Sequence, residues 1–95
     1  MSMEPDRDYS GEALNRLREA GIDFDPEFSS ALGQFINRGI RRAQSEGRQG
    51  EYEPALEAFI QAMLQYATDT NIRFYNASVF RRIRDLFCPG FWPFC

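Results

Sequence analysis

Two cysteines near the end of the sequence are the residues whose chemistry is easiest to identify. Cys88 and Cys95 bracket residues 89–94, a segment that contains proline, glycine and large aromatic residues and no charge. Its turn-forming residues could bring the two sulfurs together, and a closed ring of about eight residues would stabilise the fold by roughly 2.5 kcal/mol. In a reducing compartment, which we expect for this chain, two free thiols are favoured over a bridge. A Cys88–Cys95 disulfide is the alternative hypothesis.

The sequence contains few of the residue types that carry out acid–base catalysis or bind metal ions. The chain contains no His and no Lys, so all 11 of its basic residues are Arg. An imidazole is the usual general base near neutral pH and a common metal ligand, and a lysine is needed for a Schiff base. Glu53 and Glu57 stand four residues apart on one predicted helical face, a spacing typical of solvated carboxylates. We therefore expect no enzyme activity, no metal site and no cofactor.

Arginines gather on two of the predicted helices. They are Arg38, Arg41 and Arg42 within residues 26–46, and Arg81, Arg82 and Arg84 within residues 77–87. If these helices met, the arginines would form a local surface for anions or nucleic acid on an otherwise acidic protein. The net charge of −3 argues against nucleic acid as the partner. Nucleic-acid binding is therefore the third hypothesis, behind two that rest on the end of the chain.

A short first helix is predicted over about residues 11–20. Ser10 is a favourable N-cap for it. Gly21 stands where a residue in the left-handed conformation often ends a helix, and Ile22 would then contact Leu17, as in a Schellman motif. This helix has only two or three turns, so it needs packing to be stable.

A longer second helix is predicted from Pro26 to about Glu46. Asp25 is its expected N-cap, and a proline in the first helical position is favourable there. Gly33 and Gly39 lower its intrinsic stability, and we expect that such small residues let another segment approach closely. The start of this helix is therefore well defined by Asp25 and Pro26, and Gly33 and Gly39 are the two positions where we expect close packing.

Two further helices complete the predicted architecture. After a turn at residues 47–50, Pro54 marks the first turn of a helix that runs to about Thr68. Asn76 is the expected N-cap of a fourth helix over about 77–87, whose apolar and arginine-rich sides face in opposite directions. The sequence thus alternates helical segments with short connections.

The fold class follows from these elements. We predict an all-α fold, a small four-helix bundle-like domain over residues 10–87, with a polar N-terminal arm over 1–9 and an apolar tail over 88–95. Residues 72–75 are expected to be extended or to form a bridging turn. The chain starts without the basic and apolar segments of a secretory signal and has no apolar stretch of about 20 residues, so we expect a cytoplasmic protein.

Residues 88–95 form the least ordinary part of the sequence. The tail could pack into a groove between its own helices, or its aromatic residues could anchor another protein or a second copy of the chain. A weaker interpretation makes the fourth helix and the tail a foot on a membrane surface. In these three interpretations the same aromatic side chains contact the protein's own core, a protein partner or a membrane surface.

A further alternative treats the tail as a unit of its own. A helical segment followed by a short terminus rich in Cys, Pro and aromatic residues resembles, in arrangement, the precursors of ribosomally made modified peptides. The resemblance covers residues 88–95, and it implies that a peptide bounded by Cys88 and Cys95 is the functional product.

The prediction we favour is a non-catalytic interaction protein: an adaptor, assembly factor or regulator. Its partner would be another protein or a second copy of the chain, held by burial of apolar side chains. The apolar residues predicted to bind the partner are Phe80, Ile83, Phe87, Phe91, Trp92 and Phe94. Arg81, Arg82 and Arg84 would orient that partner electrostatically more than hold it.

Overall fold

The computed structural model describes residues 7–88 and 90–95. The described residues form α1 (Tyr9–Glu19), β1 (Asp23–Phe24), α2 (Pro26–Ser45), α3 (Gln49–Thr70), β2 (Phe74–Tyr75) and α4 (Ala77–Phe87). The prediction of an all-α, bundle-like fold is confirmed, since the strands are only two residues long each.

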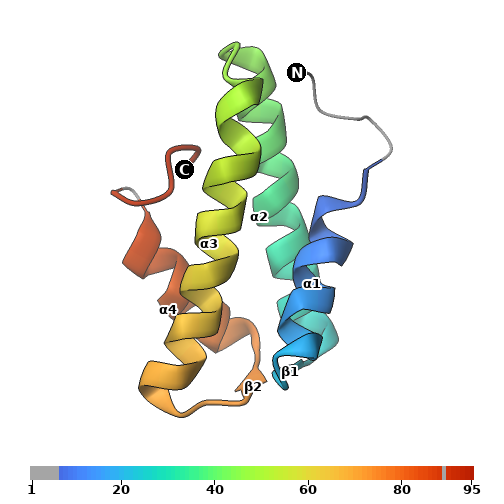
Figure 1. Cartoon of the computed structure of the whole chain (residues 1–95), viewed down its shortest axis with the longest axis vertical. Helices are drawn as coiled ribbons and strands as arrows, with labels where there is room; N and C mark the ends of the chain where they lie inside the picture. The colour runs from blue at the N-terminus through green and yellow to red at the C-terminus, as the bar shows by residue number, and fades with distance from the viewer. Residues whose placement is uncertain (1–6, 89) are drawn as a thin grey trace.

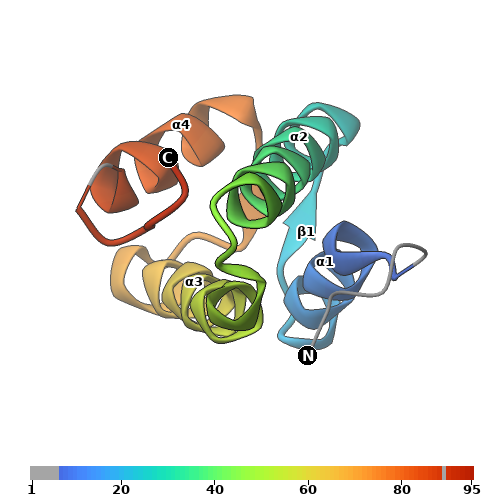
Figure 2. The ribbon, with the colours of Figure 1, turned by 90° about the horizontal axis from the view of Figure 1, so that it is seen from above.

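The helices stack in two layers. Seen from above, α1 and α3 form one layer, and α2 and α4 form the other (Figure 2). Helices that follow one another along the chain run in opposite directions, so α2 and α4 run in the same direction (Figure 1). The helix α2 contacts each of the other three helices. As a result, the C-terminal halves of α2 and α4 lie at the same end of the molecule as the tail.

The predicted caps of α2 and α4 are confirmed. The carboxylate of Asp25 accepts a hydrogen bond from the main-chain N–H of Phe28, and the side-chain oxygen of Asn76 accepts one from Val79, both at 2.9 Å. Each cap satisfies one of the N–H groups that a helix leaves without a partner in its first turn. These two positions therefore set where both helices of one layer begin.

The start of α1 differs from the prediction. Asp8, not Ser10, is the N-cap, and its carboxylate accepts a 2.9 Å hydrogen bond from the main-chain N–H three residues later. The helix therefore begins at Tyr9, whose side chain is buried in the core. The predicted arm over 1–9 is wrong at this end, and its residues 1–6 lie outside the described part of the chain.

Three helices end at a residue with positive φ. These residues are Gly21 (82°), Gly47 (68°) and Asn71 (57°), and in each case the next residue donates its N–H to a carbonyl five positions back. For α1 this bond runs from Ile22 to Leu17, at 3.0 Å, as the sequence predicted. The motif satisfies carbonyl groups at the helix ends and turns the chain sharply into the next element.

A short parallel pairing joins the two connections at one end of the bundle. Asp23 pairs with Phe74, and Phe24 pairs with Tyr75. The prediction of extended chain in residues 72–75 is confirmed for the strand itself, whereas its pairing with β1 was not foreseen. Because each strand leads directly into the cap of the next helix, the pairing places the first turns of α2 and α4 side by side.

The helix α3 begins at Gln49, earlier than the predicted start at Pro54. The early turn is held by Tyr52, which is fully buried and donates its hydroxyl hydrogen to the carbonyl of Ile36 at 2.9 Å. Pro54 sits inside the helix on its exposed side, where the carbonyl that it leaves unpaired can be hydrated. The predicted turn over 47–50 is shortened accordingly.

One continuous core fills the space between the layers. Its largest fully buried side chains are Trp92, Tyr52, Tyr75, Phe28, Phe59, Leu17, Ile22, Leu32, Ile36, Met63 and Ile83. Within residues 7–88 and 90–95, no charged side chain is buried. Trp92 comes from the tail, so the tail completes the core that the helices begin.

Candidate functional site

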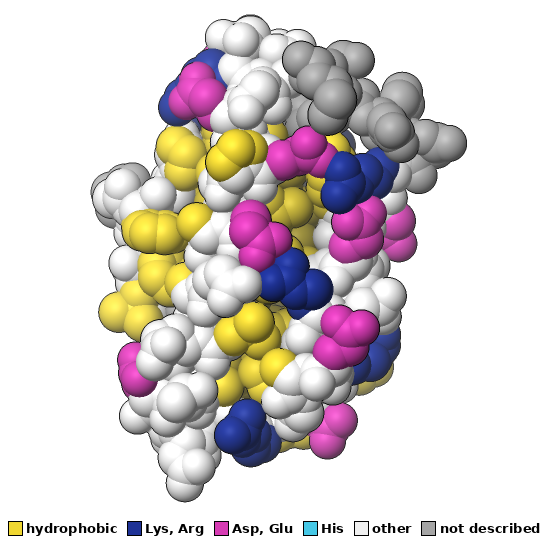
Figure 3. Space-filling model, viewed as in Figure 1, with side chains coloured by type: hydrophobic (Ala, Val, Ile, Leu, Met, Phe, Trp, Pro, Cys, Tyr) yellow, Lys and Arg dark blue, Asp and Glu magenta, His cyan; other side chains and the backbone are white. Residues whose placement is uncertain are grey.

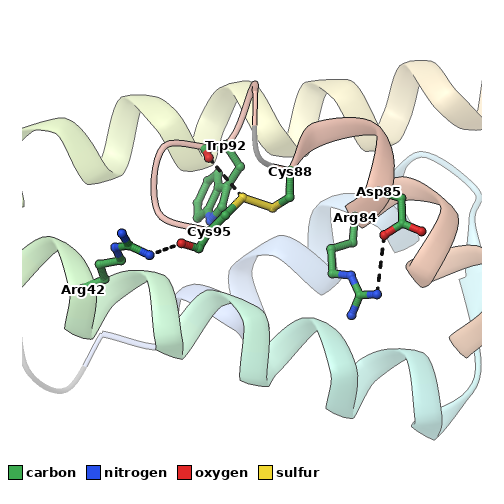
Figure 4. Close-up of a disulfide and its surroundings, with 6 residues drawn as sticks. All are labelled: Arg42, Arg84, Asp85, Cys88, Trp92 and Cys95. Atoms are coloured by element: carbon green, nitrogen blue, oxygen red, sulfur yellow. Dashed lines mark hydrogen bonds and ion pairs between the residues drawn. A yellow bond between two sulfur atoms is a disulfide. The ribbon is translucent and has the colours of Figure 1, made fainter.

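The tail turns back on α4 immediately after the helix ends. The main-chain N–H groups of Phe91 and Trp92 both donate to the carbonyl of Phe87, at 2.8 and 2.7 Å. A disulfide joins Cys88 to Cys95, with 5.9 Å between their Cα atoms (Figure 4). The expectation of free thiols is therefore wrong for this structure, because the turn brings the two sulfurs within bonding distance.

Trp92 anchors the tail in the bundle. Only 1% of this residue is exposed. Its indole packs against the rings of Phe35, Phe59 and Tyr52, with centroids 5.2, 5.3 and 5.9 Å away. It also covers the backbone of Gly39, where an added methyl carbon would lie 2.9 Å from the indole. The close approach predicted at the glycines of α2 is thus made at Gly39 by the tail.

Phe94 is the second anchor, with 3% of the residue exposed. Its ring lies 5.6 Å from the ring of Tyr52, and the guanidinium of Arg48 lies over it at 5.0 Å. Arg42 donates a hydrogen bond to the main-chain carbonyl of Cys95 (Figure 4). Two arginines at the junction of α2 and α3 therefore hold the far end of the tail.

These contacts correct the predicted partner-binding set. Four of its six apolar residues are buried within this chain: Phe80, Ile83, Trp92 and Phe94. Their side chains face the core because α4 and the tail pack on α2 and α3, so they offer almost no surface to a protein partner while the tail is in place. Phe87 is half-buried and Phe91 is 52% exposed.

The exposed remainder forms a small patch at the end of α4. Leu86, which is 63% exposed, was not among the predicted residues. The rings of Phe87 and Phe91 lie 5.2 Å apart. We call Leu86, Phe87 and Phe91 the α4 patch. Apolar side chains gather on the left flank of the face shown in Figure 3, over the α4 side of the molecule.

The predicted arginines of α4 are all exposed, and they lie beside this patch. Arg82 precedes Leu86 by one helical turn, so the two side chains are neighbours on the outer face of α4. Arg84 reaches Asp85 at 3.5 Å, and Arg81 and Arg82 make no ion pair within the described residues. The patch is therefore flanked by positive charge.

Charge is divided between the two layers of helices. The helix α2 carries three Arg and one Glu, and α4 carries three Arg and one Asp, which gives this layer a formal charge of +4. The helix α3 carries four acids and no Arg, a formal charge of −4. Of the arginines that the sequence analysis singled out on these two helices, Arg38 of α2 and Arg84 of α4 line one cavity.

A concave surface lies between α1 and α3. It is a groove of about 490 Å³ whose floor includes Leu56 and Ile60, and Figure 3 shows charged side chains above the apolar floor. Arg16 crosses it with two hydrogen bonds to the carboxylate of Glu57, at 2.8 and 2.9 Å. This ion pair lowers the pKa of Glu57 to about 2, with a smaller contribution from Gln61.

A second cluster of ion pairs lies in the same groove, around Arg7. Arg7 donates to the carboxylates of both Glu12 and Glu53. Its hydrogen bond lowers the pKa of Glu12. Glu19 also lines the groove, so its lining holds two Arg and four Glu and has a formal charge of −2. The Arg16–Glu57 pair links α1 to α3 across the groove, and we regard the groove as structural support between these two helices.

In the part of the chain that the structure describes, no group of three or more His, Cys, Asp or Glu side chains is placed to hold a metal ion. No helix there is long and apolar enough to cross a bilayer. Comparison with models of known protein families, with curated protein sequences and with solved structures finds no match to this chain.

Proposed function

We propose that this chain is a non-catalytic interaction protein that binds a protein partner through the α4 patch. The observation that carries the proposal is the exposure of Leu86 (63%) and Phe91 (52%) at one end of α4. Large apolar residues gathered on a surface are typical of interface centres, whereas single exposed ones are common everywhere. The role of adaptor, assembly factor or regulator is part of this proposal.

Charge favours an acidic partner. The patch lies in the layer of α2 and α4, whose formal charge is +4. Exposed arginines beside an apolar contact raise the rate of association with an acidic surface and align it, while burial of the apolar groups supplies most of the affinity. We therefore expect a partner with an apolar pocket bordered by Asp and Glu.

A second copy of the chain fits this patch less well. A symmetric dimer brings the same surface of both subunits together. Arg81, Arg82 and Arg84 of one copy would then approach the same residues of the other, with only Asp85 on that helix to offset them. Self-association through the patch is thus opposed by like charges, and a different, acidic protein is the better occupant.

A photo-crosslinking residue at position 91 identifies the partner, and one at position 74 is the matched control. Phe74 is also 51% exposed, but it belongs to β2 and not to the patch. A protein captured only from position 91 is then purified and its affinity is measured directly. Equal capture from both positions would count against the patch.

The affinity measurement uses the same two positions and adds Leu86. Leu86→Ser and Phe91→Ser should each weaken binding about tenfold or more, as expected at an interface centre, while Phe74→Ser should leave it unchanged. Binding by the Leu86 and Phe91 variants with full affinity would overturn the proposal. A concentration-dependent dimer lost in the same variants would replace the acidic partner with a second copy.

The precursor hypothesis receives less support from the structure. Cleavage before Cys88 would remove Trp92 and Phe94, which are both buried among the helices. A releasable peptide would be expected to hold few core side chains. Mass spectrometry of the native protein decides: an intact chain that lacks only the two thiol hydrogens agrees with a structural tail, and a fragment beginning at Cys88 supports a precursor.

Nucleic-acid binding is the second candidate, and one observation favours it. Arg38 of α2 and Arg84 of α4 line the same cavity, so the arginines of the two helices do share a surface. Phosphate binding through them would weaken steeply with salt. Loss of that salt dependence in an Arg81→Ala/Arg82→Ala double variant would support it, and absence of binding to any oligonucleotide at low salt would end it.

We also propose that the protein resides in an oxidising compartment. Disulfides persist in oxidising compartments and are rare in the cytosol, so the Cys88–Cys95 bridge argues for an oxidising site rather than the cytoplasm that the sequence suggested. Thiol labelling in intact source cells separates the two. Labelling of both cysteines would restore the cytoplasmic assignment.

A further inference from the structure

A second cavity lies on the positive side of the protein, between α2, α4 and the tail. Its volume is about 220 Å³. The apolar part of its lining consists of Phe35, Phe80, Phe94 and the Cys88–Cys95 bridge. All three aromatic residues belong to the core, so the lining is fixed by the packing of the bundle and does not have to be assembled by a ligand.

Two arginines complete this lining, one from each helix. They are Arg38 of α2 and Arg84 of α4. Arg38 makes no hydrogen bond or ion pair within the described residues, and Arg84 reaches only Asp85, at 3.5 Å. Figure 4 shows the Arg84 side chain extending from α4 toward α2. No acidic residue lines the cavity.

We infer that this cavity binds a small carboxylic acid with an apolar body. The exposed edges of the aromatic rings and the disulfide would contact the apolar part, and the guanidinium groups of Arg38 and Arg84 would hold the carboxylate. A guanidinium group can donate two parallel hydrogen bonds to a carboxylate. Because both groups are charged at neutral pH, these hydrogen bonds are stronger than those between neutral groups. This inference does not depend on the proposed protein partner.

The volume limits the size of the ligand. An engineered apolar cavity of about 150 Å³ is large enough for benzene. The present cavity is larger and partly open to solvent, so a fused two-ring acid is the expected size. We expect a dissociation constant of about 10 µM to 1 mM, in the range reached by ligands that make this few contacts.

The experiment is an NMR titration of the oxidised full-length chain with two compounds of the same shape. 2-Naphthoate carries the carboxylate, and 2-naphthalenemethanol replaces it with a neutral hydroxyl. We expect saturable shifts at Phe35, Phe80 and Phe94 with the acid, and about tenfold weaker binding of the alcohol. Equal affinity for both compounds, or shifts centred on the groove between α1 and α3, would overturn the assignment.

Substitution of single arginines distinguishes direct contact of the ligand with Arg38 and Arg84 from long-range attraction by the positive charge of the two helices. Arg38→Gln and Arg84→Gln should each weaken 2-naphthoate about tenfold, because each removes one charged partner of the carboxylate. Arg41→Gln and Arg82→Gln change the net charge equally on the same two helices, but these residues do not line the cavity. They should leave the affinity within about twofold.

Both outcomes of that comparison are decisive. All four arginines are exposed, so every variant should keep the melting temperature of the parent, and a melt of each confirms the fold. Equal weakening by the cavity and control variants would show only long-range attraction and would reject the site. Absence of saturation at about 5 mM 2-naphthoate would reject it as well, since that exceeds the expected dissociation constant.

Discussion

The indole of Trp92 lies against the backbone of Gly39, so that an added methyl carbon on the glycine would lie 2.9 Å from the ring. The ring of Tyr52 would be 3.2 Å from the same carbon. Gly39 therefore leaves the space that lets the tail enter the bundle.

Gly39→Ala should lower the stability of the fold by about 1–2 kcal/mol, because overpacking opposes the gain in helix propensity. Gly33→Ala is the matched control in the same helix, since the nearest atom to its new methyl carbon would be 3.9 Å away. We expect it to raise stability by up to about 1 kcal/mol. Urea denaturation of both variants measures the difference, and equal changes would mean that the contact with Trp92 is unimportant.

Trp92→Ala and Phe91→Ser should separate the two functions of the tail. Trp92 is buried, so its truncation should cost about 3–5 kcal/mol, which is a large part of the stability of a chain this short. Phe91 is exposed, and its replacement should change stability by no more than about 0.5 kcal/mol. Thermal melts followed by circular dichroism test both values. Similar losses in the two variants would contradict the division into core and surface.

Reduction of the Cys88–Cys95 bridge should destabilise the fold by about 2.5 kcal/mol, the chain-entropy value for a ring of about eight residues. Trp92 should become partly exposed, with a shift of its fluorescence to longer wavelength. A Cys88→Ser/Cys95→Ser variant should behave like the reduced protein and should not respond to reductant. A tail that remains in place after reduction would show that Trp92 and Phe94 alone hold it.

The Arg16–Glu57 pair predicts a pH dependence. The pKa of Glu57 is lowered to about 2, mainly by Arg16, so the pair stabilises the folded state above about pH 4.5. That contribution falls as the pH drops from 4.5 through 2, and it should be small because both side chains are exposed. NMR titration of the Glu57 carboxyl carbon gives its pKa directly. Arg16→Gln should raise it, with a residual lowering by Gln61.

Alkaline titration tests the buried hydroxyl groups. Tyr75 donates to the carbonyl of Met63 at 2.6 Å, and burial raises its pKa to about 12. Burial also raises the pKa of Tyr52. Because both phenols bind their protons more tightly when folded, their contribution to stability should be constant below about pH 10 and fall above it. NMR signals of the Tyr52 and Tyr75 rings should report ionisation only together with unfolding, and ionisation of either phenol in the folded state at about pH 10 would contradict the raised pKa values.

Local signals account for the part of the fold that could be predicted. The caps Asp25 and Asn76 and the stop at Gly21 act on residues within one helical turn, so a single sequence reveals them. The early start of α3 depends on Tyr52 finding the carbonyl of Ile36. That contact joins two helices and leaves only a weak trace, an aromatic residue four positions before Leu56.

The pairing of β1 with β2 could not be predicted for the same reason. Its partners, such as Asp23 and Phe74, are far apart in sequence, and two-residue strands carry too little periodicity to be recognised. The division of the tail into exposed and buried side chains could not be predicted either. Phe91 and Pro93 are exposed and Trp92 and Phe94 are buried because the chain turns twice over these residues, and the aromatic sequence alone does not say which rings the turns direct inward.

The disulfide has a consequence for binding that goes beyond stability. It closes a ring that contains Phe91, and Trp92 fixes the neighbouring position of that ring in the core. The exposed phenyl group is thus held in place before any partner arrives. Ordering a mobile side chain at an interface costs about 0.5–1.5 kcal/mol, and a preorganised one avoids much of that loss. The bridge should therefore make Phe91 a rigid anchor, and reducing it should weaken association even where Phe91 itself is unchanged.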